Sequence, residues 1–297
     1  MFRSHAAVCV FLTALHSWGQ QQNQANESTP LIADRPGFSD GVNIVPRGLF
    51  HWESGFSLNL AAHRHVGAGD LLELEAERNM LAGAPVLRVG VSRRFELRFG
   101  GDGVLYHSHR ISGASHFQTG LSDLAAGFKV ALVEEQRAIP ALTLVSMFSL
   151  PVGAPAFSSG AIDPTLKLAW SKELWKEWTV SGNLNASSLS TSESGRFLQK
   201  AASFQVSRPM WADLGAFAEV YTITPPFPGE RSLWTFDGGF THPLGNYMQI
   251  DLSCGQQIVP RERTWFLAVG LAFRGSLLHG RIPALRLSSQ LDQDRKR

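Results

Sequence analysis

The chain has 297 residues, with 27 Lys or Arg against 25 Asp or Glu, so its formal net charge is +2. Hydrophobic residues make up 44% of the chain, and the mean hydropathy is −0.05. The only basic block is the terminal Asp294–Arg297, so nothing points to a nucleic-acid partner. The composition fits a soluble protein and an outer-membrane β-barrel equally well. The strands of such a barrel alternate lipid-facing apolar residues with lumen-facing polar ones, so their mean hydropathy is no higher than that of a soluble protein.

The N-terminus predicts export. Arg3 precedes an apolar run, Ala6–Leu15, and small residues stand three and one positions before a cleavage site at Gln20. This is the three-part pattern of a secretory signal, and the run is too short to span a bilayer. We therefore expect residues 1–19 to be a signal peptide, the alternative being a buried N-terminal helix.

Neither a disulfide nor a transmembrane helix is expected. Cleavage would remove Cys9 and leave Cys254 as the one cysteine of the mature chain, so no intramolecular pair can form. After Leu15 no run approaches the roughly 18 apolar residues of a transmembrane helix. If this exported chain is a membrane protein, we therefore expect it to cross the membrane with β-strands.

Period-2 alternation starts at Gly48–Leu60 and continues nearly to the end of the chain. Segments of this kind also lie in Leu72–Glu77, Leu87–Ser92, Phe95–Gly100, Leu124–Leu132, Leu166–Trp170, Trp178–Asn185, Trp234–Phe240, Met248–Leu252 and Trp265–Phe273. Each predicts a β-strand with one apolar face. The pattern favours a single antiparallel transmembrane β-barrel of about 12 strands, with a range of 10 to 14.

Short and long connections alternate between these segments. Ser92–Arg94, Ser207–Asp213 and His242–Asn246 read as tight turns, whereas Asp102–Gly120, Pro151–Pro164 and Thr224–Arg231 read as long loops. This asymmetry is typical of the periplasmic turns and extracellular loops of an outer-membrane barrel.

The polar face of the strands carries charges of both signs, as a hydrated lumen crossed by ion pairs would. The expected lumen-lining residues are His51, Glu53, Glu73, Glu75, Glu77, Arg88, Glu96, Arg98, Lys129, Asp237 and Asp251. We expect Glu53 to border water, so that its reversal to Lys leaves assembly nearly unchanged. Three glutamates on one strand repel each other unless they are partnered, and we expect Glu73, Glu75 and Glu77 to face Arg88, Arg98 or Lys129.

Two segments flank the predicted barrel of residues 46–274. Residues 20–45 are polar and contain Asp34, Arg35 and Pro36. These three residues form a turn motif, and an ordered turn would have no role in a free tail. We expect them to form a plug under or inside the barrel, with a flexible periplasmic leader as the alternative. Residues 275–297 form a C-terminal tail that we expect to be dispensable.

No cofactor, metal or catalytic site is expected. His63 with His65, and His107 with His109, are pairs two residues apart that would share a strand face as a metal clip. The sequence supplies no Cys or carboxylate cluster at ligand spacing beside them. No GxSxG elbow occurs, and the glycines at 100, 101 and 103 end a strand without opening a helix, so they are no phosphate cradle.

Several motifs together resemble an outer-membrane transporter family named for the meta-pathway of phenol degradation. They lie in Ala33–Phe56, Leu87–Gly100, Gly120–Leu132, Pro140–Gly153, Leu214–Tyr221 and Asp237–Gly255. The resemblance runs in order from Ala33 to Phe273 and implies an outer-membrane barrel that passes small molecules, including aromatic or hydrophobic ones. The chain departs from the family pattern at its end, where residues follow the usual terminal aromatic strand.

We therefore expect a channel or transporter, and no enzyme, in the outer membrane of a Gram-negative-type bacterium. Its partners would be outer-membrane lipid and a small-molecule permeant. The alternatives are a structural or adhesive barrel with a closed lumen, and a soluble periplasmic β-protein.

Overall fold

The computed structural model describes residues 30–66, 72–111, 114–191, 195–211, 213–225, 231–259 and 264–277. Within the first two strands, side chains are described up to position 61 and again from position 77. The predicted signal peptide and the tail from residue 278 lie outside the described residues.

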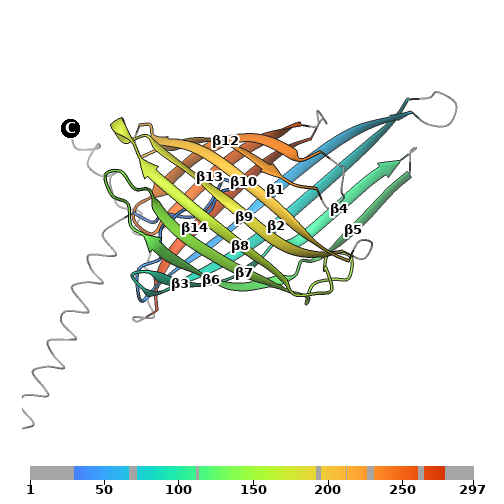
Figure 1. Cartoon of the computed structure of the whole chain (residues 1–297). Helices are drawn as coiled ribbons and strands as arrows, with labels where there is room; N and C mark the ends of the chain where they lie inside the picture. Colours follow the sequence, from blue (N-terminus) through green and yellow to red (C-terminus); the bar gives the residue numbers. More distant parts are fainter. Residues whose placement is uncertain are drawn as a thin grey trace, which may run out of the picture.

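The strands close into a barrel (Figure 1). Strand β1 (Leu49–Val66) pairs with β14 (Trp265–Ser276) on one side and with β2 (Leu72–Ser92) on the other. All pairings between the described strands are antiparallel. The other elements are β3 (Phe95–Gly101), β4 (Gly103–Ile111), β5 (Ala114–Leu121), β6 (Leu124–Val133), β7 (Ala141–Leu150), β8 (Asp163–Glu173), a short 3₁₀ turn (Trp175–Glu177), β9 (Thr179–Thr191), β10 (Gly195–Pro209), β11 (Gly215–Ile223), β12 (Leu233–Leu244) and β13 (Met248–Val259).

Fourteen described segments build twelve barrel strands. Segments β3 and β4 pair with successive parts of β2 and are separated only by Asp102. Segments β5 and β6 lie beside β4 and β3 in the same way. The predicted fold, a single antiparallel barrel of about 12 strands, is confirmed.

The prediction of a long loop at Asp102–Gly120 is wrong, because β4 and most of β5 occupy it. The Gly, Ser and His residues of Asp102–Gly120 interrupt the alternation of apolar and polar residues by which a strand is recognised in a sequence. The segment is nevertheless extended because β2, with 21 residues, offers an edge for pairing along its whole length. Likewise, the two short strands predicted between Leu72 and Ser92 are one strand.

Two ends of the barrel differ in their connections. Tight connections join β2 to β3, β10 to β11 and β12 to β13, at the end where β1 starts and β14 finishes. Longer connections such as residues 151–162 lie at the opposite end. By the general rule for outer-membrane barrels, the first end is periplasmic and the second extracellular.

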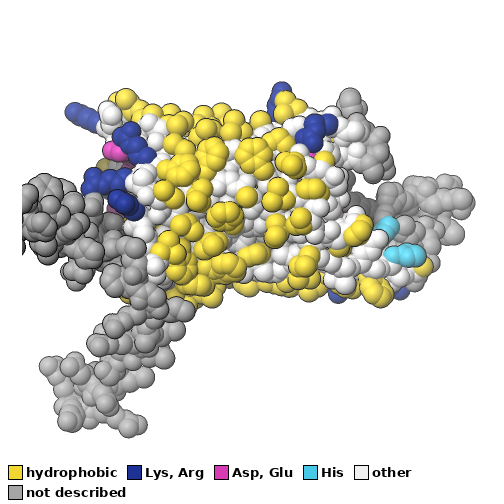
Figure 2. Space-filling view, turned by 90° about the horizontal axis from the view of Figure 1, so that it is seen from below, with side chains coloured by type: hydrophobic (Ala, Val, Ile, Leu, Met, Phe, Trp, Pro, Cys, Tyr) yellow, Lys and Arg dark blue, Asp and Glu magenta, His cyan; other side chains and the backbone are white. Residues whose placement is uncertain are grey.

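The outer surface is apolar around the middle of the barrel, and Lys and Arg gather toward its ends (Figure 2). Strand β1 shows the alternation: Trp52 and Phe56 are 36% and 37% exposed, whereas His51 and Glu53 are 3% and 2% exposed. The polar parity therefore faces the interior and the aromatic parity faces outward, where a bilayer would contact it. The part of the chain that the structure describes contains no helix that is long and apolar enough to cross a membrane.

At the extracellular end, part of the wall projects beyond its neighbours (Figure 1). The projecting sheet consists of β1 from Ala61, β2 up to Leu81, β4 from Leu105, and β5. Strand β14 pairs with β1 only as far as Leu60. Among the described strands, none pairs with the outer edge of β5.

Candidate functional site

A cluster of charged side chains lies inside the barrel on β1, β2, β3 and β6. The Arg88 Nε atom donates to Glu96 Oε1 at 2.8 Å, and its Nη1 atom donates to Glu53 Oε1 at 2.9 Å. Arg98 and Lys129 complete the cluster, and Arg88, Glu96 and Lys129 are all 0% exposed. Buried charges of this kind persist only when they are paired.

Asp34 of the N-terminal segment (residues 30–48) enters the centre of this cluster. Its carboxylate accepts from Lys129 Nζ at 3.0 Å and from Arg98 Nη1 at 2.8 Å, and it lies 3.2 Å from Arg88 Nη1. Three cations thus meet three carboxylates, those of Asp34, Glu53 and Glu96. Burial by itself would raise the pKa of Asp34, but the three neighbouring cations outweigh it and hold the pKa well below its usual range.

Arg35, the next residue, contacts β13 and β14, which adjoin β1 on the side away from β2. Arg35 Nε donates to Asp251 Oδ2 on β13 at 3.4 Å, and Arg35 Nη2 donates to the Val269 carbonyl at 3.3 Å. On β11, Glu219 accepts from the backbone N–H groups of Phe38 and Ser39 at 2.6 and 3.0 Å. The segment is therefore bound to two sides of the lumen, because β11 lies across the barrel from β2, β3 and β6 in the strand order.

Further along, the N-terminal segment is bound by backbone and side-chain contacts. Asp40 pairs with Lys167 at 2.6 Å and with Arg98 at 3.1 Å. Burial raises the pKa of Asp40, but Lys167 and Arg98 lower it more, to about 2. The Val45 N–H group donates to Glu96 at 2.7 Å, and Thr143 donates to the Val42 carbonyl at 2.9 Å. Because its partners come from β1, β2, β3, β6, β7, β8, β11 and β13, the segment lies inside the barrel.

Most of the predicted lumen residues have buried side chains on the inward parity. These are His51, Glu53, Arg88, Glu96, Arg98, Lys129, Asp237 and Asp251. The side chains of Glu73 and Glu75 lie outside the described residues. Glu77 does not face Arg88, Arg98 or Lys129, because it lies in the projecting sheet, about 35 Å along β2 from Arg88 at 3.3 Å per residue. Its partners are Asn79 and His107.

The expectation that Glu53 borders water is also wrong. Besides Arg88, its carboxylate accepts from the Asp34 N–H group at 3.1 and 3.2 Å, and the residue is 2% exposed. A lysine at position 53 would add a fourth cation to the cluster of Arg88, Arg98 and Lys129 and place it next to the buried Arg88. We therefore expect Glu53→Lys to impair assembly, in contrast to the neutral result that strand alternation predicts.

The predicted set of lumen residues leaves out several charged residues of the interior, among them Glu219, Lys167 and Arg274. Glu219 lies on the inward parity of β11, Lys167 on that of β8, and Arg274 near the end of β14, where it donates to His51 Nε2 at 3.2 Å. Alternation marks Glu219 and Lys167 as polar-face residues. Arg274 escaped because the strand was taken to end one residue earlier.

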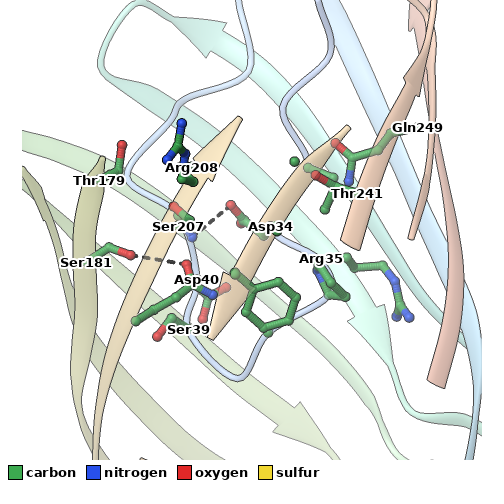
Figure 3. A pocket seen from close by; sticks show the side chains of 18 of the residues that line it. Asp34, Arg35, Ser39, Asp40, Thr179, Ser181, Ser207, Arg208, Thr241 and Gln249 are labelled. Atoms are coloured by element: carbon green, nitrogen blue, oxygen red, sulfur yellow. Dashed lines mark hydrogen bonds between the residues drawn. The ribbon is translucent and has the colours of Figure 1, made fainter. Parts of the chain in front are cut away.

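A cavity of about 260 Å³ remains beside the N-terminal segment at the periplasmic end (Figure 3). The segment contributes Asp34, Arg35 and Asp40 to its wall. The barrel contributes the polar side chains of Thr179, Ser181, Gln205, Ser207, Arg208, Thr241 and Gln249, and also Pro209, Ala216 and Phe217. The cavity therefore offers many polar groups beside a few apolar ones and has room for water or a small solute.

A second cavity, of about 480 Å³, lies toward the extracellular end. Its lining combines hydroxyl groups, Gln199 and the carboxylates of Asp102, Asp123 and Asp163 with the apolar side chains of Met147, Phe157, Leu189 and Phe197. The connection 151–162 forms one side and is bound to Asp123, which accepts from the Gly153 and Ser159 N–H groups at 2.9 and 3.2 Å. An amphipathic cavity thus lies in the outer half of the lumen.

Comparison with known structures shows the same architecture. An outer membrane channel from Pseudomonas putida F1 is 14% identical, with a TM-score of 0.59, and the match covers 81% of this chain and 99% of that one. The transport unit of the autotransporter AIDA-I from Escherichia coli is 8% identical, with a TM-score of 0.51, covering 87% and 97%. At these identities the likeness concerns the fold alone.

Among proteins with curated descriptions, none matches the sequence. One family model does match it, over residues 33–275, from Ala33 of the N-terminal segment to the last-but-one residue of β14. The match agrees with the resemblance carried by the sequence motifs and with the closed barrel. This outer-membrane β-barrel belongs to the family described as "Putative MetA-pathway of phenol degradation".

Proposed function

We propose that the protein is an outer-membrane channel for small molecules whose lumen is restricted by the N-terminal segment acting as a plug. The observation that carries this proposal is the set of contacts that join the segment to opposite walls of a closed barrel, from Asp34 to β3 and β6 and from Phe38 and Ser39 to Glu219 on β11. A segment that is bound to both sides of the lumen, by ion pairs on one side and by hydrogen bonds to Glu219 on the other, fills part of the cross-section that a solute would need. Export by the predicted signal peptide, in a Gram-negative-type bacterium, belongs to the same proposal.

Deletion of the plug tests the proposal. Removing residues 20–44 should raise the single-channel conductance in a planar bilayer severalfold, because the segment leaves the lumen. Deleting only residues 20–29 is the matched control and should leave conductance unchanged, since the described contacts begin at Pro30. A barrel that assembles normally without residues 20–44, yet conducts no better, would favour a closed structural or adhesive barrel.

The outer cavity indicates the class of permeant. A cavity of about 480 Å³ is larger than the roughly 150 Å³ that holds benzene in an engineered protein cavity, so a single-ring molecule fits. Its aromatic side chains suit the ring and its hydroxyl groups suit a polar substituent. We propose that small amphipathic molecules with one ring rest here before passing the plug.

Truncation of one aromatic side chain tests this choice. Phenol is the probe, and its binding is measured as interruptions of the channel current. Phe197→Ala should weaken phenol binding by about 2- to 10-fold, because the variant loses one aromatic contact. Leu198→Ala is the matched control, because Leu198 is the next residue on β10 and is 58% exposed on the outer face. Equal effects of the two variants would show that phenol does not use this cavity.

A further inference from the structure

Histidines of the projecting sheet lie together on its inward face. His107 and His109 alternate along β4, so they share a face. The register places His116 of β5 directly opposite His109, and Glu77 of β2 opposite His109 on the other side. Residues directly opposite each other in antiparallel strands have Cβ atoms about 4.5–5.5 Å apart. Three imidazoles and a carboxylate therefore occupy neighbouring positions.

Hydrogen bonds already orient part of this group. Asn79 Nδ2 donates to Glu77 Oε1 at 2.9 Å, and Asn79 Oδ1 is hydrogen-bonded to His107 Nδ1. With the His107 proton on Nδ1, the other ring nitrogen, Nε2, is the one that can ligate a metal. This arrangement, in which a polar partner fixes the orientation of a histidine ring, is the usual outer support of a metal ligand.

The side chains are close to one another and reachable from outside. His107 Nδ1 lies 3.5 Å from Glu77 Oε1, with the two side chains 35% and 32% exposed. The ring centroids of His107 and His109 are 6.2 Å apart. As the described side chains stand, no three of them converge on one point, so a shared ion requires rotation of the imidazoles, above all that of the exposed His116.

We propose that His107, His109 and His116, with Glu77, bind one divalent transition-metal ion at the extracellular mouth of the channel. Imidazole nitrogen with one carboxylate suits Zn²⁺, Cu²⁺ or Ni²⁺, whereas Mg²⁺ and Ca²⁺ prefer oxygen ligands. Histidine side chains are visible at one end of the molecular surface in Figure 2. The site is separate from the plug, so its test does not depend on the proposed function.

Titration of the purified full-length protein with Zn²⁺ in detergent is the direct test. Isothermal calorimetry should show one Zn²⁺ per chain, with no comparable binding of Mg²⁺. His109→Ala with His116→Ala should weaken Zn²⁺ binding at least tenfold, and Glu77→Gln should weaken it by less. Gln118→Ala is the matched control, because Gln118 shares the strand and the face of His116.

Heat-modifiable migration on gels verifies that each variant still forms the barrel. Two results would overturn the proposal. One is wild-type protein that takes up no Zn²⁺ at millimolar concentration. The other is undiminished Zn²⁺ binding in a folded variant lacking all three histidines, which would place the ligands elsewhere.

Discussion

Replacing Asp34 by alanine should release the plug and raise the conductance of the channel. Asp34 contacts Arg88, Arg98 and Lys129 at once, whereas Asp40 of the same segment pairs only with Arg98 among these three. The loss of Asp34 removes the carboxylate that pairs with Lys129, while Arg88 keeps Glu53 and Glu96 and Arg98 keeps Asp40. Removal of one partner from a buried ionic cluster typically costs about 3–5 kcal/mol. Because water can enter the lumen, we expect the lower end, about 3 kcal/mol, or roughly a 100-fold shift from the docked toward the undocked plug.

Single-channel recording of Asp34→Ala in a planar bilayer measures this effect, alongside the variant lacking residues 20–44. Glu134→Ala is the control, since Glu134 pairs with Arg94 at 3.1 Å but both side chains are largely exposed, at 74% and 63%. An exposed pair contributes at most about 1 kcal/mol, so this variant should conduct like the wild type. If Asp34→Ala forms a normal barrel and its conductance equals that of Glu134→Ala, the plug is not held through Asp34.

A lysine on the outer face should destabilise the barrel, whereas a lysine on the inner face of the same strand should not. Leu184, near the middle of β9, is 58% exposed on the apolar surface. Leu184→Lys places a charge against lipid at the depth where this costs about 2–4 kcal/mol. Ser187 lies three residues further on the opposite parity, where it accepts from Thr165 Oγ1 at 2.9 Å. There a lysine side chain reaches the water of the lumen.

Urea unfolding in phospholipid vesicles, followed by tryptophan fluorescence, compares the two variants. Leu184→Lys should lose about 2–4 kcal/mol of the free energy of unfolding, and Ser187→Lys less than about 1 kcal/mol. A larger loss for Ser187→Lys than for Leu184→Lys would contradict the assignment of the faces of β9. The same comparison also tests whether the apolar belt in Figure 2 contacts lipid.

The sequence by itself determined the fold class and, for the strands it predicted, which side chains point inward and which point outward. Period-2 alternation is a local property, since successive side chains of an extended chain point to opposite faces whatever the strand pairs with. It therefore sufficed to place His51, Arg88 and Lys129 on the inward side and Trp52 on the outward side. Strand ends were less certain, as the loop wrongly predicted at Asp102–Gly120 shows.

Only the tertiary structure decided which charges meet. The partners of Asp34 lie 54, 64 and 95 positions away along the chain, and no local pattern encodes such pairings. Strand register likewise placed Glu77 beside His107 and brought His116 opposite His109, whereas the sequence had suggested isolated histidine pairs. The physical reason is that alternation fixes a side chain's face, while the neighbours it meets across the lumen or the sheet depend on barrel closure and register.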